Sequence, residues 1–228
     1  MKRLIAVTFC TLALPGLIMS GCGSSRRTAP GDERPAELSR EKVDVEAYLF
    51  DAKIRRDGKP TSFRLELFQT DSIIALGGRG YLGKGALKGR LTADSLEVYF
   101  PSTDEFVCEP VADLLASFDC LGELPPVNLL SLFQNLPDSV IDDVNATVVS
   151  DYSNRKRPKF IVSFDQCPWE INLVYDRRGD RWRIRQFSYS DGDRFSLKAT
   201  RREYRDHARV KAGKFTVCVP HHASRIIP

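Results

Sequence analysis

The sequence lacks the features that mark several classes of protein. Only one long apolar run is present, glycine has no three-residue period and no apolar heptad is sustained, which excludes multi-span membrane, collagen-like and coiled-coil chains. The 34 Lys and Arg nearly balance the 30 Asp and Glu, so the concentrated basic excess of a nucleic-acid-binding protein is missing. The 228 residues are 42% hydrophobic, which excludes a disordered chain and is enough for one core of ordinary size.

Signatures of catalysis and of metal binding are also missing. No Gly-x-Ser-x-Gly motif occurs, and no Ser or Cys has an evident His partner in the core region. The three histidines, His207, His221 and His222, have no ligand spacing, and there is no Cys-x-x-Cys pair. Asp142 and Asp143 are adjacent carboxylates, a pair more common in a loop that enters a strand. The sequence therefore predicts a protein that is not an enzyme and has no cofactor and no metal.

The single apolar run predicts a signal peptide. Lys2 and Arg3 precede eleven apolar residues, Leu4 to Leu14, that as a helix would span about 16 Å, roughly half a bilayer. The following residues, Leu17 to Cys22, resemble the lipobox of bacterial lipoproteins. That resemblance implies removal of residues 1–21 and lipidation of Cys22, and the absence of Asp after Cys22 implies an outer-membrane anchor facing the periplasm. The alternative is an ordinary secretory cleavage site with a chance cysteine.

Residues 22–42 are predicted to be the lipidated cysteine and a flexible tether, because almost no large apolar residue occurs there. Residues 43–204 then form one domain, and residues 205–228 are a C-terminal extension in which Phe215 to Val219 could add an edge strand.

The domain alternates between apolar and polar residues for most of its length, which predicts half-buried antiparallel strands. In the first strand, Val43, Val45, Ala47 and Leu49 are the expected inward set. Further strands are expected at 63–67, 73–76, 87–91, 96–100, 144–149, 160–164, 170–175, 182–189 and 195–200. Two segments change to helical spacing: Val111 to Phe118, and Leu129 to Leu136. The expected fold class is α+β, mainly β: a curved antiparallel sheet forming an open half-barrel covered by two short helices.

This order of elements resembles the LolA/LolB-type fold, an open β-barrel with a helical lid found in periplasmic lipoprotein carriers. The resemblance rests on the lipobox, on Gly89 to Tyr99, on Leu124 to Pro137 and on Trp182 to Gly192. It implies a protein that carries lipid or lipoproteins. It also implies a membrane loop with an exposed leucine, whose nearest counterparts are Leu76, Tyr81 and Leu82.

A glycine-rich segment from Gly78 to Lys84 matches two nucleotide-binding patterns in part. Both patterns need a following helix, which Gly85 and Gly89 disfavour, and the P-loop also needs Ser or Thr where Gly85 stands. We therefore predict a flexible, close-approaching loop at a barrel rim and no nucleotide site.

Aromatic and apolar residues crowd the late strands and the two predicted helices. In a closed barrel they would fill the core, and in an open one they would line a lipid cavity. The predicted cavity residues are Phe160, Phe164, Trp182, Ile184, Phe187, Tyr189, Phe195, Leu115, Phe118, Leu132 and Phe133. The first case predicts an anchored interaction domain with an envelope protein partner. The second predicts a carrier of lipid or lipoprotein acyl chains.

Four cysteines remain after the signal peptide, namely Cys108, Cys120, Cys167 and Cys218. In an oxidising periplasm an even count predicts two disulfides, with three connectivities. Pairing Cys108 with Cys120 and Cys167 with Cys218 is favoured.

Three arginines alternate with apolar residues in one predicted strand. Arg181, Arg183 and Arg185 therefore share its outer face, with Arg155 to Lys159 and Arg201 to Arg202 as further basic neighbours. A solvated face that discourages edge pairing is the simpler interpretation. The functional alternative is a basic face resting on anionic headgroups.

Overall fold

The computed structural model describes residues 41–226, apart from 57, 81–82, 84, 118–129, 142–145, 165–166, 168 and 192–194. The predicted signal peptide, the lipidation site Cys22 and nearly all of the tether lie outside these residues. No helix of the described chain is long and apolar enough to cross a membrane.

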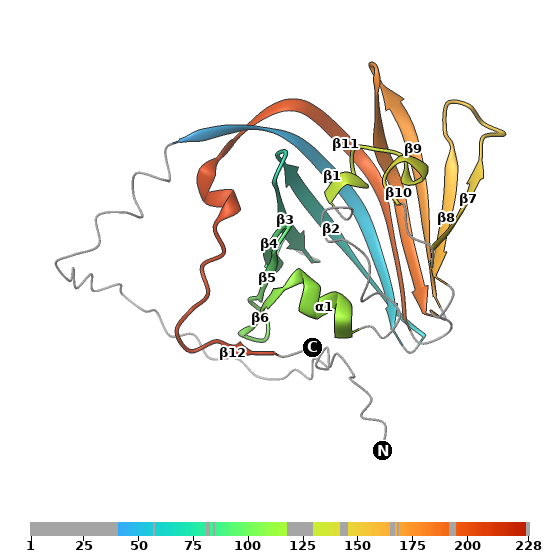
Figure 1. Ribbon diagram of the computed structural model, residues 1–228. Helices are drawn as coiled ribbons and strands as arrows, with labels where there is room; N and C mark the ends of the chain where they lie inside the picture. Colours follow the sequence, from blue (N-terminus) through green and yellow to red (C-terminus); the bar gives the residue numbers. More distant parts are fainter. Residues whose placement is uncertain are drawn as a thin grey trace.

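One sheet of twelve strands contains most of the described chain (Figure 1). In chain order the elements are β1 Lys42–Arg56, β2 Lys59–Gln69, β3 Ile73–Arg79, β4 Gly85–Thr92, β5 Ser95–Phe100, β6 Glu105–Pro110, helix α1 Val111–Ser117, the 3-10 turn η2 Pro137–Ser139, β7 Ala146–Asp151, β8 Lys159–Phe164, β9 Glu170–Arg178, β10 Arg181–Asp191, β11 Phe195–Lys211, the 3-10 turn η3 Ala212–Phe215 and β12 Ser224–Arg225.

The sheet is open and almost entirely antiparallel. Its strand order is β12-β6-β5-β4-β3-β2-β1-β11-β10-β9-β8-β7, so β12 and β7 are its two edges, and only the short pair β12–β6 is parallel. The long strands β1 and β11 arch over the molecule, and α1 lies inside the curl of the sheet (Figure 1). The prediction of a mainly β, curved antiparallel sheet is confirmed.

Only one of the two predicted helices is seen among the described residues. Helix α1 matches the first, but the described part of the second, 130–136, is mostly a turn that leads into η2. Within it the amide of Phe133 bonds the carbonyl of Leu130 at 3.3 Å, and the amide of Asn135 bonds that of Ser131 at 2.9 Å. Pro137 follows at once and has no amide hydrogen to extend a helix. The apolar side chains are nevertheless buried, because Leu130 and Leu132 belong to the core cluster.

The inward face of β1 differs from the prediction because the strand contains two irregularities in its pairing with β11. One lies between Val45 and Ala47 and the other between Leu49 and Phe50. An extra residue in one strand moves the following side chains to the opposite face. The buried set is therefore Tyr48, Phe50 and Ala52, and Glu46 is buried with them. The predicted set of Val43, Val45, Ala47 and Leu49 is wrong beyond Val45.

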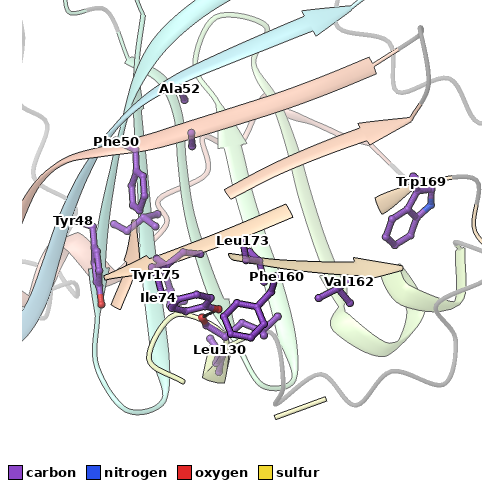
Figure 2. Packing of buried hydrophobic residues seen from close by; sticks show 14 of the residues in the cluster. Tyr48, Phe50, Ala52, Ile74, Leu130, Phe160, Val162, Trp169, Leu173 and Tyr175 are labelled. Atoms are coloured by element: carbon purple, nitrogen blue, oxygen red, sulfur yellow. Dashed lines mark hydrogen bonds between the residues drawn. The ribbon is translucent and has the colours of Figure 1, made fainter. Parts of the chain in front are cut away.

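The core lies between the concave face of the sheet and the segment 130–141. Figure 2 shows side chains from β1, β3, β8 and β9 packed together with Leu130. Phe50, Phe160 and Tyr175 are fully buried, and the rings of Phe160 and Tyr175 meet edge to face with centroids 5.7 Å apart. Each such buried aromatic contributes a large apolar area.

The glycine-rich segment is largely strand. Gly77 and Gly78 belong to β3, and Gly85 begins β4, so a strand stands where a nucleotide site would need a helix. A β-carbon on Gly89 would lie 2.9 Å from the carbonyl oxygen of Glu97 and 3.0 Å from Cγ2 of Val98. The backbone of β5 thus approaches Gly89 within the sheet. The loop predicted from Gly78 to Lys84 is in part strand, since Gly78 and Arg79 belong to β3, and Tyr81, Leu82 and Lys84 lie outside the described residues.

The C-terminal extension wraps around the sheet. Strand β11 runs without a break past the predicted domain boundary at residue 204 to Lys211. Lys214 of η3 lies over the ring of Phe68, 5.1 Å from its centroid, and β12 then pairs beside β6. The predicted edge strand at Phe215 to Val219 is wrong, since the edge strand is Ser224–Arg225.

We expect Gly89→Ala to lower the free energy of unfolding by about 1–3 kcal/mol, because the added methyl group meets the backbone of β5. Urea unfolding of the wild type and the variant measures the change. Gly213→Ala is the control, since a β-carbon there meets nothing within 4 Å. Equal midpoints for the two variants would contradict the packing described.

Candidate functional site

The sheet divides locally between β10 and β11, and the most polar part of the interior lies there. The two strands pair only from Gln186 to Asp191, and a register shift in β10 lies between Ile184 and Gln186. Beyond this point β11 continues along β1. The amide of Ile184 is instead 3.4 Å from the carbonyl oxygen of Phe133, and its carbonyl accepts a bond of 2.7 Å from the guanidinium of Arg201. The segment 130–141, which we call the lid segment, and the side chain of Arg201 thus supply the missing strand partners.

A buried ion pair occupies this opening. The guanidinium of Arg183, whose side chain is only 2% exposed, donates to the carboxylate of Glu46. Glu46 also accepts from the Tyr48 hydroxyl at 2.6 Å, and Arg183 donates to the Tyr204 hydroxyl at 3.3 Å. Every member of this network therefore has a partner, which a buried charge requires.

The tyrosines of the network remain protonated. Burial raises the pKa of Tyr48, and its hydrogen bond to the negatively charged Glu46 raises it further. Burial likewise raises the pKa of Tyr175, whose hydroxyl donates to the carbonyl of Leu132 at 2.6 Å. Both hydroxyls act as donors: Tyr175 links the lid segment to β9, and Tyr48 holds the carboxylate of Glu46 in place.

A second buried pair lies beside the first. Arg201 contacts both carboxylate oxygens of Asp176, at 2.5 and 2.6 Å, and its guanidinium carbon lies 5.4 Å from the centre of the Tyr204 ring. Arg178 and Arg185 approach the same carboxylate at 3.5 and 3.6 Å. Each of the two buried arginines is thus matched by one acid, and Arg178 and Arg185 add positive charge beside Asp176.

Two pockets flank the turn between β9 and β10, with volumes of about 450 and 380 Å³. Asp180, Arg181 and Arg183 line both of them. The larger pocket also reaches the lid segment and brings Leu136 and Trp182 beside these charged groups. Its volume lies in the range of small-molecule sites, and its walls are both apolar and ionic.

The predicted cavity residues lie on the core side of the sheet. Phe160, Phe164, Ile184 and Leu132 are buried, and Trp182, Phe187, Tyr189 and Phe133 are half-buried against them. The ring of Phe195 lies tilted beside that of Tyr189, with centroids 5.9 Å apart. Of this set only Trp182 lines either pocket. The side chain of Leu115 and all of Phe118 lie outside the described residues.

The structure separates the three arginines that were predicted to share an outer face. The side chain of Arg181 is 65% exposed and that of Arg185 is 32% exposed, whereas Arg183 is buried. The register shift in β10 and the absence of β11 beside its first residues accompany the difference, since alternation is a poor guide in an irregular strand that is paired on one side only.

The predicted disulfides and the predicted membrane loop are the two remaining sets of site residues. Cys108 and Cys218 are free, exposed thiols, so the predicted pairs Cys108–Cys120 and Cys167–Cys218 are both wrong. Cys120 lies outside the described residues, and Cys167 packs half-buried against the core. Of the predicted membrane loop, Leu76 lies within β3 and packs on the core, and Tyr81 and Leu82 lie outside the described residues.

Sequence reasoning missed the two buried ion pairs. Glu46 and Asp176 sit at positions that strict alternation assigns to a solvated face, and nothing near them in the sequence announces a bulge. The one available signal is the number of arginines in β10 and β11, some of which could be expected to pair with acidic residues elsewhere in the chain. Within the described ranges, no three His, Cys, Asp or Glu side chains group as metal ligands would.

We expect Arg183→Leu to destabilise the protein by about 3–5 kcal/mol, because it leaves the Glu46 carboxylate buried without its partner. Glu46→Leu combined with Arg183→Leu should recover part of that loss, which urea unfolding of the two single variants and the double variant will measure. Arg202→Leu is the control, since Arg202 and Asp51 form an exposed pair at 3.7 Å that is worth less than about 1 kcal/mol. Purely additive effects of the two substitutions would contradict the pairing.

We also expect the pKa of His207 to lie above the ordinary histidine value. The hydrogen bond of Nδ1 to Asp44, at 3.0 Å, and the charges of Asp206 and Asp44 favour the protonated ring. Any stability from these contacts is complete below the ordinary pKa of histidine and is lost as pH rises past that of His207. NMR titration should show that Asp44→Asn lowers this pKa and that Asp51→Asn leaves it unchanged. An unshifted His207 in the wild type would contradict the contact.

Comparison with known proteins adds only distant similarity. No protein-family model matches the chain, and no curated protein matches it at a significant level. An uncharacterized conserved protein from Thermus thermophilus aligns with 78% of this chain and 90% of its own, at 11% identity and a TM-score of 0.41. A predicted outer membrane lipoprotein-sorting protein domain from Vibrio parahaemolyticus aligns with 71% of this chain and 85% of its own, at 8% identity and a TM-score of 0.38. A DUF1329 family protein from Desulfovibrio piger aligns with 79% of this chain and 92% of its own, at 10% identity and a TM-score of 0.41. The chain is thus structurally similar, at low identity, to a LolA-like sorting domain and to a DUF1329 protein, and similarity this distant assigns no function.

Proposed function

We propose that this protein is a non-catalytic lipoprotein, anchored through Cys22 to the outer membrane and facing the periplasm, that binds an amphiphile on the concave face of its sheet. The guest is a lipid or the acyl chain of a lipoprotein, and delivery of lipoproteins to that membrane is the role it fits. The observation that carries the proposal is the larger pocket, where the apolar Leu136 and Trp182 meet Arg181 and Arg183 at one end of the apolar face.

The apolar part of the proposed site is the concave face of β2 to β4. Phe63, Leu65, Leu76 and Leu91 point to this face and are only half-buried, although they pack on the core. The sheet does not close, so a guest can reach these side chains without crossing a strand. Each square ångström of apolar surface that a guest covers there contributes about 25 cal/mol.

The polar part of the proposed site is the charged wall of the larger pocket. Arg181 is exposed enough to turn toward a ligand, while Arg183 is held by Glu46. Asp138 and Asp180 line the same wall. A wall with both signs of charge suits a headgroup that offers both hydrogen-bond donors and acceptors better than a bare anion.

A second candidate function is an anchored interaction domain with a filled core and an envelope protein partner. The close ring packing favours it, since Phe187 lies with its centroid 5.4 Å from that of Phe50 and 6.3 Å from that of Phe133. In this case the concave face has no room for a guest, and a protein partner binds the outer surface.

Uptake of a fluorescent fatty acid distinguishes the lipid-binding function from the interaction domain. The chain from residue 41 onward contains all twelve strands, and we expect it to take up the probe. Leu65→Trp should weaken uptake by at least about tenfold, because the larger ring occupies the concave face. Arg181→Gln should weaken uptake by a few-fold, because it removes a positive charge that would lie near the carboxylate of the probe.

Two matched variants serve as controls. Val149→Trp places the same ring on the outer face, and Arg202→Gln removes an exposed arginine outside both pockets, so neither should change uptake. No uptake by the wild type, or equal losses in Leu65→Trp and Val149→Trp, would leave the interaction domain as the better account.

A further inference from the structure

Two neighbouring hairpin turns form a basic end of the sheet. The turn between β7 and β8 carries Arg155, Lys156 and Arg157, and Lys159 begins β8; we call these four residues the basic tip. Beside it, Arg177 and Arg178 end β9 at the turn that leads into β10. The two turns are neighbours because the amide of Tyr175 donates to the carbonyl of Pro158 at 3.1 Å. Both turns stand together at the upper right of Figure 1.

The charges of the basic tip are available to a partner. All four side chains belong to exposed residues, and among the described residues no acidic side chain lies within ion-pair distance of Arg155, Lys156 or Arg157. Lys159 faces Asp151 across the β7–β8 ladder, and its charge helps to lower the pKa of that carboxyl. Arg183 and Arg201, by contrast, are buried and neutralised by Glu46 and Asp176. The basic surface is therefore the pair of turns and not the strand face that alternation predicted.

Exposed apolar side chains lie next to the basic tip. The described residues include four large hydrophobic side chains that are exposed, and three of them belong to the hairpin of β7 and β8: Val149 at 55%, Tyr152 at 44% and Ile161 at 37%. Val149 and Ile161 are direct cross-strand partners. An apolar pair and a tyrosine beside unpaired lysine and arginine suit a lipid interface, where headgroups and acyl chains are both present. A nucleic acid would offer nothing to Val149 and Ile161.

The chain enters the sheet at the same end. Asp44 in β1 contacts His207, and His207 lines the smaller pocket together with Arg178 and Arg181 of the β9–β10 turn. Strand β1 begins only two residues earlier, at Lys42. The nineteen residues between Cys22 and Lys42 can span at most about 65 Å. A lipid at Cys22 therefore keeps this end of the sheet within reach of the membrane.

We infer that the basic tip and its exposed apolar neighbours dock this domain onto the surface of an anionic membrane. The choice of a membrane as partner rests on the proposed anchor at Cys22, and the contact itself does not depend on a guest in the concave face. Docking would hold the opening between β10 and β11 close to the headgroups. A guest could then pass between the bilayer and the larger pocket over a short distance.

Vesicle co-sedimentation of residues 23–228, which lack the lipid but keep every described strand, tests the inference. We expect the chain to sediment with vesicles of phosphatidylethanolamine and about 30% phosphatidylglycerol, and not with phosphatidylcholine vesicles. A basic residue near an anionic surface contributes roughly fivefold in affinity. Arg155→Gln, Lys156→Gln and Arg157→Gln together should therefore weaken binding by at least about tenfold. A higher salt concentration should also weaken binding of the wild type to the anionic vesicles, because it screens these charges.

The matched control removes the same number of charges at the opposite end of the sheet. Lys53→Gln, Arg55→Gln and Lys59→Gln alter exposed residues of the β1–β2 hairpin and should leave vesicle binding unchanged. Val149→Thr with Ile161→Thr should reduce the fraction that stays bound at high salt. Fatty-acid uptake should be normal in the basic-tip variant, which separates this test from that of the proposed function.

Three results would overturn the inference. The first is a wild-type chain that does not sediment with the anionic vesicles, and the second is an equal loss in the two triple variants. The third is tighter binding of the wild type to a single-stranded oligonucleotide than to the vesicles, since this would make the basic tip a nucleic-acid surface.

Discussion

The need to cover one apolar face of a sheet that does not close governs this structure. A sheet of this size buries its concave side chains only if other segments lie over them, and here the described cover is a single short helix and the turn-rich segment 130–141. Part of the face, around Phe63, Leu65 and Leu76, stays half-buried. The concave face is therefore less completely covered around these residues than around Phe50 and Tyr175.

The opening between β10 and β11 shows how the sheet tolerates a local break. Ile184 loses its strand partners on one side, and the backbone of Phe133 and the side chain of Arg201 replace them. The charges brought in by this arrangement are neutralised by Glu46 and Asp176. A buried pair of this kind adds little net stability, but it strongly opposes any shift that would separate the partners. It therefore fixes how the lid segment, the larger pocket and the end of the sheet are placed relative to one another.

The sequence is informative where pairing is regular and misleading where it is not. The alternation of Phe63, Leu65 and Leu67 correctly predicts the inner face of β2, because no residue is inserted there. In β1 and β10 irregular pairing breaks the alternation, so Tyr48 and Arg183 lie on the buried side although a period of two places them outside. Gly89 is conspicuous in the sequence, but the close approach it permits needs a neighbouring strand whose position only the fold defines. Ion pairs between residues far apart in the chain, such as Glu46 and Arg183, leave no local pattern at all.

The most direct test of a guest in the concave face is native mass spectrometry of the mature protein extracted from its own membrane. After subtraction of the mass of the chain and of the lipid proposed at Cys22, the account predicts an additional mass equal to one lipid or acyl chain, lost on collisional activation. Leu65→Trp should lack that mass while keeping the anchor. A single species with the mass of the anchored chain alone, identical in both proteins, would contradict the account.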